Sequence, residues 1–318
     1  MNEEQLQRII DDHTAYTVRR APRTLGRIMR RRQLFERRLR RHWGRSLDLC
    51  LLTFNYAEAV GSGVNQSMPV PGDIVTSALI QLHARACRAA DEVHCLLAAG
   101  HGQGAMKPVR LLYELAAVAS VIGAHGRSPG HEDLVERYYA YEDYAAFRAM
   151  QIHQRYADEL GQEPFPADEV EEARLASEAA VDTYGKVIKG QLGWAAGLLG
   201  DINTEALAKL AGLAHLHPYF EWASAETHAG AQGMRLNMVE TRRGPVLQTG
   251  PSVAGFVEPA DLAVQFLCHI TAALVEHSLP ECDKELWFHL AVLHKLQMRT
   301  HDALEAAHHK TRDLPLIG

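Results

Sequence analysis

Apolar residues recur every three or four positions along most of the chain, which is the spacing of an α-helix that buries one face. Proline and glycine separate many of these periodic stretches. The stretches predict helices over residues 3–17, 24–43, 47–60, 73–99, 105–123, 132–160, 168–189, 192–199, 204–213, 219–229, 259–277 and 283–310. Residues 234–250 instead predict two short β-like arms. The pattern therefore predicts an all-α fold, a multi-helix bundle with one short β-hairpin-like insertion.

Proline and glycine also predict where the chain divides. Pro22 predicts a break between the first two helices, and the glycines of 61–63 predict a turn before the proline-rich residues 69–72. Asp73 or Thr76 is suited to cap the next helix. We expect three regions: a basic N-terminal helical segment over 1–60, a main helical domain over 73–310 and a tail over 311–318.

Composition narrows the class of protein. No stretch reaches the roughly 18 consecutive apolar residues that a membrane-spanning helix needs, and the first residues lack the pattern of a signal peptide. The five cysteines are odd in number and form no C-x-x-C pair, which indicates reduced thiols and no thiolate zinc site. No glycine-rich phosphate loop follows a predicted strand. We therefore expect a soluble, cytoplasmic protein without transmembrane insertion, cofactor or metal.

Charge is distributed unevenly along the chain. Residues 18–45 hold twelve arginines and one acid, Glu36, a net charge of +11, whereas the whole chain carries −6, so the remainder carries −17. An arginine-rich helix gains affinity for RNA or other nucleic acid through counterion release. Docking on an acidic protein surface or a second copy, and binding to an anionic membrane, are the alternatives. The predicted nucleic-acid-binding residues are Arg27, Arg30, Arg31, Arg32, Arg37, Arg38, Arg40 and Arg41.

Arg110 and Glu114 stand out in the apolar helix predicted over 105–123. They are four residues apart and therefore neighbours on one helix face. A buried arginine needs a partner, and a carboxylate is the best one. The structural interpretation is a pair that holds helices in register. The functional interpretation is an Arg110 that faces a cavity and binds an anion such as phosphate or carboxylate.

A second polar group lies in the helix predicted over 219–229. Glu221, Ser224 and His228 share one stripe of that helix, where an imidazole beside a carboxylate and a hydroxyl would suit a general base. A histidine satisfied in the core or at a helix end is the structural alternative, and metal ligation is a third interpretation. If the chain has an active site, we expect Arg110 to stabilise phosphate charge and His228 to transfer protons.

Several of these residues also carry a family resemblance, which covers roughly residues 75–278. The segments are similar to those of a family of bacterial all-helical proteins of unknown function, and the resemblance implies the same fold. The segments that resemble this family are 110–114, 137–138, 193–196 and 219–230.

Some members of that family look similar to helical HEPN ribonucleases and defence effectors, whose signature is an arginine followed four to six residues later by a histidine. Arg88 with His94 and Arg148 with His153 have that spacing. In both pairs alanine follows the arginine, where the ribonucleases usually have a polar residue.

The last predicted helix carries His294, His301 and His308 at intervals of seven residues, with Glu305 between the last two. Metal binding or pH sensitivity is one interpretation, and a solvated flank beside the leucine face of the helix is the other.

These features lead to two predictions of function. The first is an RNA-directed effector, a ribonuclease of the toxin or defence type whose basic segment grips RNA. The second is a non-catalytic helical interaction or ligand-sensing module, dimeric, in which the Arg110–Glu114 pair is architectural.

Overall fold

The computed structural model describes residues 2–67, 72–236, 238–241, 244–278 and 284–311. The predicted tail from residue 312 onward and Cys282 lie outside the described residues. The longer elements are α1 (Glu3–Gln66), α2 (Ile74–Ala98), α3 (Gly102–His125), α4 (Leu134–Leu160), α5 (Ala167–Tyr184), α9 (Val257–Ser278) and α10 (Lys284–Thr311). The shorter ones are η1 (Lys186–Lys189), η2 (Gly193–Ala195), α6 (Thr204–Leu210), η3 (Ala214–Leu216), α7 (His217–Thr227), α8 (Ala231–Leu236), β1 (Met238–Thr241) and β2 (Gly244–Leu247).

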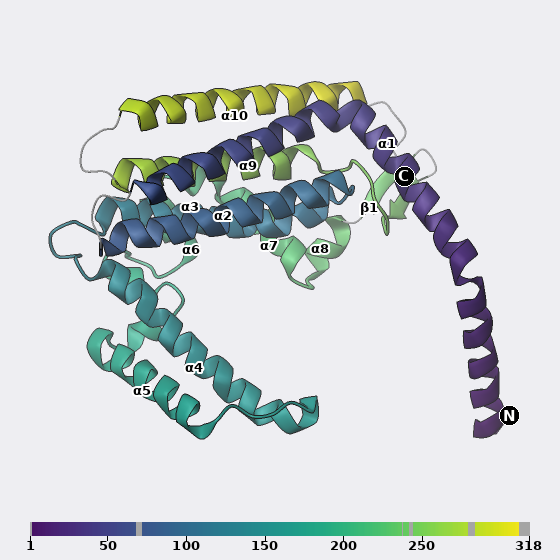
Figure 1. Ribbon diagram of the computed structural model, residues 1–318, viewed down its shortest axis with the longest axis horizontal. Coiled ribbons are helices and arrows are strands. Elements are labelled where there is room, and N and C mark those ends of the chain that lie inside the picture. Colours follow the sequence, from purple (N-terminus) through teal and green to yellow (C-terminus); the bar gives the residue numbers. More distant parts are fainter. Residues whose placement is uncertain (1, 68–71, 237, 242–243, 279–283, 312–318) are drawn as a thin grey trace.

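Five long helices form the bundle that confirms the predicted all-α fold. The second half of α1 packs between α2, α9 and α10, while α3 packs against α2, α9 and the short helix α7 (Figure 1). Strands β1 and β2 pair in antiparallel fashion beside it, which agrees with the predicted hairpin-like insertion. Among the described helices, none is long and apolar enough to cross a membrane.

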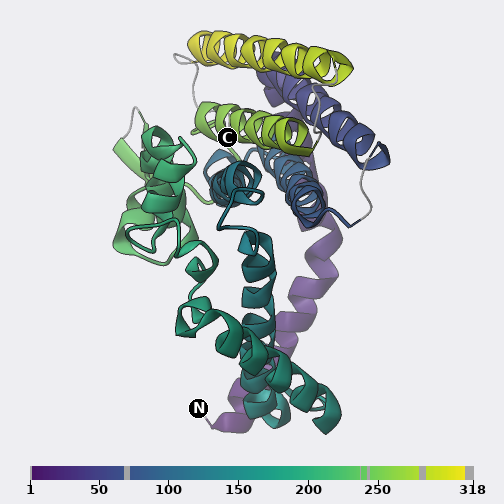
Figure 2. The same cartoon turned by 90° about the vertical axis from the view of Figure 1, so that its left-hand side faces the viewer.

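Two arms project from the bundle to the same side (Figures 1 and 2). One is the first half of α1, in which every described residue before Phe35 except Ala21 is exposed. The other is the hairpin of α4 and α5, which pack mainly against each other and against η1 and η2. In Figure 1 the two arms stand apart.

Helix α1 is continuous where the sequence predicted breaks at Pro22 and at 61–63. Asn2 caps its start by accepting a hydrogen bond from the N–H of Gln5. Pro22 lies inside the helix, although proline there removes one backbone hydrogen bond and crowds the preceding turn. Gly61 is no turn residue: a Cβ at this position would lie 2.3 Å from Cε1 of His83. This glycine lets α1 approach α2 closely. The division of the chain into 1–60 and 73–310 remains a prediction.

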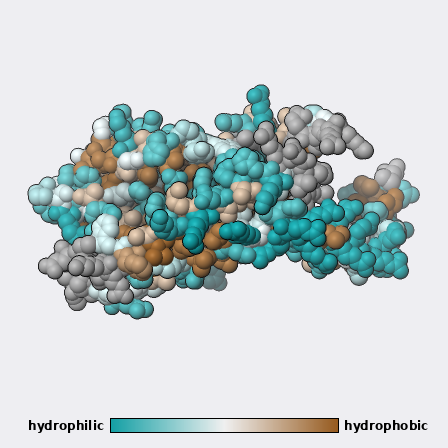
Figure 3. All heavy atoms as spheres, turned by 90° about the horizontal axis from the view of Figure 1, so that it is seen from above, coloured by the Kyte–Doolittle hydropathy of each residue, from teal (hydrophilic) through white to brown (hydrophobic). Residues whose placement is uncertain are grey.

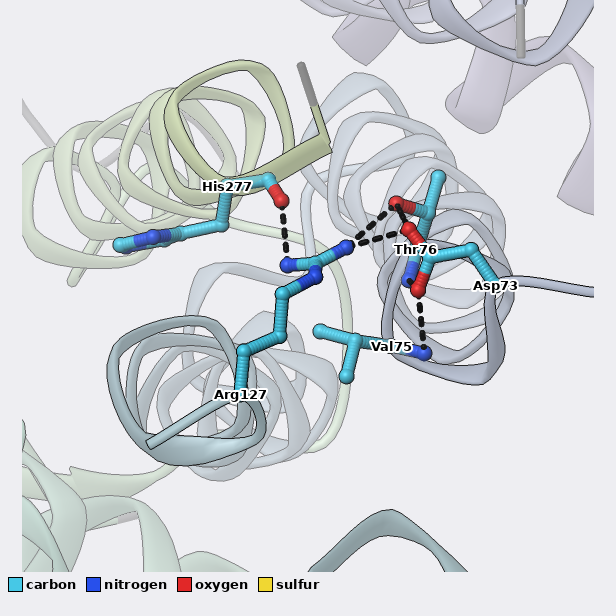
Figure 4. A network of polar contacts seen from close by, with 5 residues as sticks. All are labelled: Asp73, Val75, Thr76, Arg127 and His277. Carbon is cyan, nitrogen blue, oxygen red and sulfur yellow. Dashed lines mark hydrogen bonds and ion pairs between the residues drawn. The ribbon is translucent and has the colours of Figure 1, made fainter. Parts of the chain in front are cut away.

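Arg127 ties three helix ends together (Figure 4). Its Nη1 donates to the carbonyl of His277 at the end of α9 (2.6 Å), and its Nη2 donates to Oγ1 of Thr76 (3.0 Å) and pairs with the carboxylate of Asp73. Asp73 is the predicted cap of α2 and accepts from the N–H of Val75 (3.1 Å). Burial opposes the charged carboxyl, but its bonds to Thr76 and Arg127 hold the pKa of Asp73 below its usual range.

Smaller differences concern helix ends. Residues 192–199 form the short 3₁₀ helix η2 and turns, because glycine at 193, 197 and 200 disfavours a longer helix. Helix α3 begins at Gly102 and not at 105, so Pro108 lies inside the helix and not in its first turn.

Candidate functional site

Arg110 is fixed between α3 and α7. Its Nε donates a hydrogen bond to Oγ of Ser224 (3.0 Å), and its Nη1 and Nη2 reach the two carboxylate oxygens of Glu114 (3.3 and 3.2 Å). The guanidinium also lies over the ring of Phe220, 4.8 Å from the ring centroid. The side chains of Arg110 and Glu114 are only 28% and 22% exposed. The pair is therefore held from two helices in a largely desolvated setting.

The environment of Glu114 has two opposing influences. Burial raises the pKa of its carboxyl above the usual range, while the nearby guanidinium groups of Arg110 and Arg85 act to lower it. Glu114 therefore pairs directly with Arg110 and also lies in the electrostatic field of Arg85 on α2.

A second chain of polar contacts runs beside the first. The hydroxyl of Tyr113 lies 3.3 Å from Nδ1 of His217, and Nε2 of His217 lies 3.4 Å from a carboxylate oxygen of Glu221. Burial, together with the charges of Glu205 and Glu221, raises the pKa of Tyr113 to about 12, so its hydroxyl stays protonated. Glu221 thus contacts His217 and does not join the Arg110 cluster.

His228 lies beyond the end of α7. The sequence placed it on the helical stripe of Glu221 and Ser224, but α7 ends at Thr227 and His228 has extended backbone (φ −99°, ψ 148°). Its side chain is exposed and forms no hydrogen bond with the described residues. The structure therefore brings together Arg110, Glu114 and Ser224, and leaves His228 outside that cluster.

The two arginine–histidine pairs with ribonuclease-like spacing do not form contacts of their own. Arg88 pairs with Glu92 on the surface (3.4 Å), and burial lowers the pKa of His94. Nε2 of His153 donates a hydrogen bond to Oε1 of Gln162 (3.0 Å), and the imidazole packs against the ring of Phe165.

The histidines of α10 are also separate. His301 pairs with Asp261 of α9 (3.1 Å), and Glu305 lies 3.8 Å from His309. Within the described part of the chain, no three potential ligands converge on a metal position.

A pocket of about 500 Å³ lies directly beside Glu114, between α2, α3, α4 and residues 191–207. Its lining combines Arg85 and two carboxylates with aromatic and apolar side chains. Tyr138 meets Trp194 edge to face, with centroids 5.3 Å apart. The polar and aromatic lining residues are Gln81, Arg85, Glu114, Tyr138, Tyr139, Tyr141, Glu142, Gln191, Trp194 and Thr204.

The shape of this pocket depends on a close backbone approach. A Cβ on Gly193 would lie 1.9 Å from the carbonyl oxygen of Val187, so only glycine fits where η2 passes η1. This approach sets Trp194, which is 1% exposed, against α4.

The sequence did not predict the pocket, although parts of it carried a signal. Glu114, Tyr138 and Trp194 belong to segments that carried the family resemblance. Arg85 carried no signal, because an arginine at an exposed position of an amphipathic helix is ordinary.

The arginines of α1 form a face of their own. At 3.6 residues per turn, all twelve except Arg32 and Arg40 fall within about 120° of the helix circumference. Leu25, Ile28 and Phe35 lie on the opposite face. Figure 3 shows the projecting part of α1 as mostly hydrophilic with a few hydrophobic side chains. Of the eight predicted nucleic-acid-binding arginines, all exposed, only Arg40 forms an ion pair within the described residues, with Asp48 (2.7 Å).

The fold and the site define an all-α bundle protein with a polar pocket at the side of its core. Residues 76–245 match a family described as a family of unknown function (DUF5677), and the chain belongs to this family. The matched region contains the whole pocket and the Arg110 cluster, whereas the arginine face of α1 lies outside it. No curated protein and no solved structure matches the chain.

Proposed function

We propose that the chain is a non-catalytic ligand-sensing module whose site is the pocket between α2, α3 and α4. The observation that carries this proposal is the commitment of Arg110 to Glu114, Ser224 and the Phe220 ring. An arginine paired in this way supports its neighbours, and here it holds the Glu114 carboxylate at the pocket wall. A volume of about 500 Å³ is in the usual range for small-molecule sites.

The lining indicates the chemistry of the ligand. Glu114 and Glu142 would bind an amino group, and Arg85 would bind a carboxylate or another acceptor. Tyr138 and Tyr139 supply an aromatic wall with hydroxyl groups that burial keeps protonated by raising their pKa values. A small zwitterionic molecule, such as an amino acid or a related amine, therefore fits best.

The test is a thermal-shift screen of amino acids, amines and nucleosides, followed by calorimetry of the compounds that bind. Arg85→Gln should abolish binding. Arg88→Gln is the matched control, because Arg88 is on the same helix but its side chain is 84% exposed and lies outside the pocket. Binding that Arg85→Gln leaves unchanged, or no binding in any of these classes, would count against the proposal.

A second candidate function is an RNA-directed effector of the toxin or defence type. This proposal includes a similarity of the chain to HEPN-type ribonucleases. The exposed arginine face of α1 supports it, because unpaired cations are the groups that phosphates bind. Purified protein would be incubated with total RNA beside a His228→Ala variant. Intact RNA in both lanes would contradict the ribonuclease hypothesis. An affinity for RNA that does not change with salt concentration would contradict RNA binding through the arginines.

A further inference from the structure

The arm of α1 has an apolar face that nothing in the described chain covers. Phe35, Leu39 and Trp43 are buried against the bundle. The same helix face continues toward the N-terminus through Ile28 and Leu25, which are 43% and 56% exposed. Single helices of this kind are marginal in water without a packing partner. This face therefore requires an occupant.

The hairpin of α4 and α5 presents a second uncovered apolar surface. Ile152, Tyr156 and Leu160 follow one another at four-residue spacing on α4, and Leu175 lies on α5, all of them exposed. Acidic residues surround this stripe. Residues 132–184 contain fourteen acidic and four basic side chains, a net charge of −10.

The two arms complement each other in charge and length. The arginine segment carries +11 and the hairpin −10, which is most of the −17 outside that segment. At 1.5 Å per residue, the part of α1 before Phe35 and the 27-residue α4 span about 48 and 40 Å. Within one molecule, however, the arms stand apart (Figure 1).

A two-fold axis solves this separation. Both arms leave the bundle in the same direction but from different ends of it (Figures 1 and 2). Rotation by 180° about an axis perpendicular to both arms, along the viewing direction of Figure 1, places α1 of one molecule antiparallel to the α4–α5 hairpin of the other and forms the reciprocal contact at the same time. The two bundles then lie at opposite ends of the dimer. Isologous contacts of this kind are the commonest in homodimers.

We infer that the α1 arm of one copy docks on the α4–α5 hairpin of a second copy, apolar stripe against apolar stripe, with arginines facing acidic residues at the edges. A second copy accounts for both uncovered stripes and for both charged surfaces. Nucleic acid would cover the arginines alone, and a membrane would leave the acidic hairpin without a partner.

The experiment is sedimentation velocity of the full chain with two charge-reversed variants. The first carries Arg27→Glu, Arg31→Glu and Arg38→Glu in α1, and the second carries Glu159→Lys, Asp168→Lys and Glu172→Lys in the hairpin. Each variant alone should raise the dissociation constant of the dimer by about ten-fold or more. An equimolar mixture should restore dimers, because in the mixed dimer each interface regains opposite charges.

A control variant with Arg88→Glu, Lys209→Glu and Lys295→Glu changes exposed charges on the bundle by the same amount and should dimerise normally. Circular dichroism verifies that all variants are folded. A wild-type monomer at 100 μM would overturn the inference, as would dimers unaffected by either reversal or a mixture that stays monomeric. Co-purification of the monomer with nucleic acid, or its flotation with anionic vesicles, would assign the arm to those partners instead.

Discussion

The Nε atom of Arg110 and the Oγ atom of Ser224 are joined by a hydrogen bond of 3.0 Å, which links α3 to α7 beside the candidate pocket. The other guanidinium nitrogens hold Glu114, a residue of the pocket wall. The orientation of one pocket carboxylate therefore depends on a contact made by a helix that does not line the pocket.

Loss of this link should weaken the fold in a graded way. Ser224→Ala leaves one guanidinium donor without its partner and should cost about 1 kcal/mol of unfolding free energy. Arg110→Ala also leaves Glu114 half-buried and unpaired, and should cost about 2–3 kcal/mol. Urea unfolding measures both. Arg174→Ala, whose ion pairs are on the surface, should change little, and an equal loss from all three variants would contradict this account.

Two glycines of α1, only two residues apart, should respond in opposite directions to alanine. Gly61→Ala places a methyl group 2.3 Å from the buried His83 ring and should cost about 1–3 kcal/mol. Gly63→Ala meets nothing within 4 Å and should stabilise the helix by about 0.5–1 kcal/mol. Thermal unfolding of the two variants gives the signs, and two changes of the same sign would show that α1 does not approach α2 as described.

Acid should destabilise the protein through His83. Burial lowers the pKa of this histidine from 6.5 to about 4, and its Nε2 lies 3.0 Å from Oγ1 of Thr271. Because the folded pKa is below the unfolded one, the unfolded chain binds more protons between these values. The contribution is complete above pH 6.5 and falls by about 3 kcal/mol as pH drops to 4.

The measurement is urea unfolding at pH 7 and pH 5 for the wild type and for His83→Gln. Burial also lowers the pKa values of His94, His269 and His277. The decrease in unfolding free energy from pH 7 to pH 5 should therefore be smaller in the variant than in the wild type, but it should not disappear. An unchanged pH dependence in His83→Gln would rule out this assignment.

Gly193 should be required for the pocket. Gly193→Ala drives a methyl group into the Val187 carbonyl at 1.9 Å and should displace Trp194 from Tyr138. Tryptophan fluorescence should shift to longer wavelength, and ligand affinity should fall by about ten-fold or more. Gly200→Ala, with nothing within 4 Å, is the control and should leave both readouts unchanged. The prediction fails if the two variants behave alike.

Much of the fold followed from local signals. The Asp73 cap and the four-residue spacing of Arg110 and Glu114 required only neighbours in the sequence, and both have the expected geometry. The breaks predicted at Pro22 and Gly61 failed for different reasons. Pro22 removes one backbone hydrogen bond from a helix that continues on both sides. Gly61 lies inside the helix because the ring of His83, distant in the sequence, packs where a Cβ would be.

The site was less predictable because its residues come from separate helices. The spacing of Glu221, Ser224 and His228 indicated one stripe, but that inference required the helix to continue through His228, and α7 ends at Thr227. The pocket depends on where η2 passes η1 and where α4 leaves the bundle, and neither arrangement has a local pattern. The Arg110–Glu114 pair and the separation of an arginine face from an apolar face on α1 could be predicted directly, because each follows from spacing along a single helix.

The continuity of α1 has a mechanical consequence. Because no break separates its arm from its core segment, the helix acts as a lever with its fulcrum near Phe35. A tilt of about 10° there would move the tip by about 8 Å, given an arm of about 48 Å. Helix α2 both lines the pocket and packs against α1. A small shift of α2 at the pocket would therefore be amplified into a large movement of the N-terminal tip of α1.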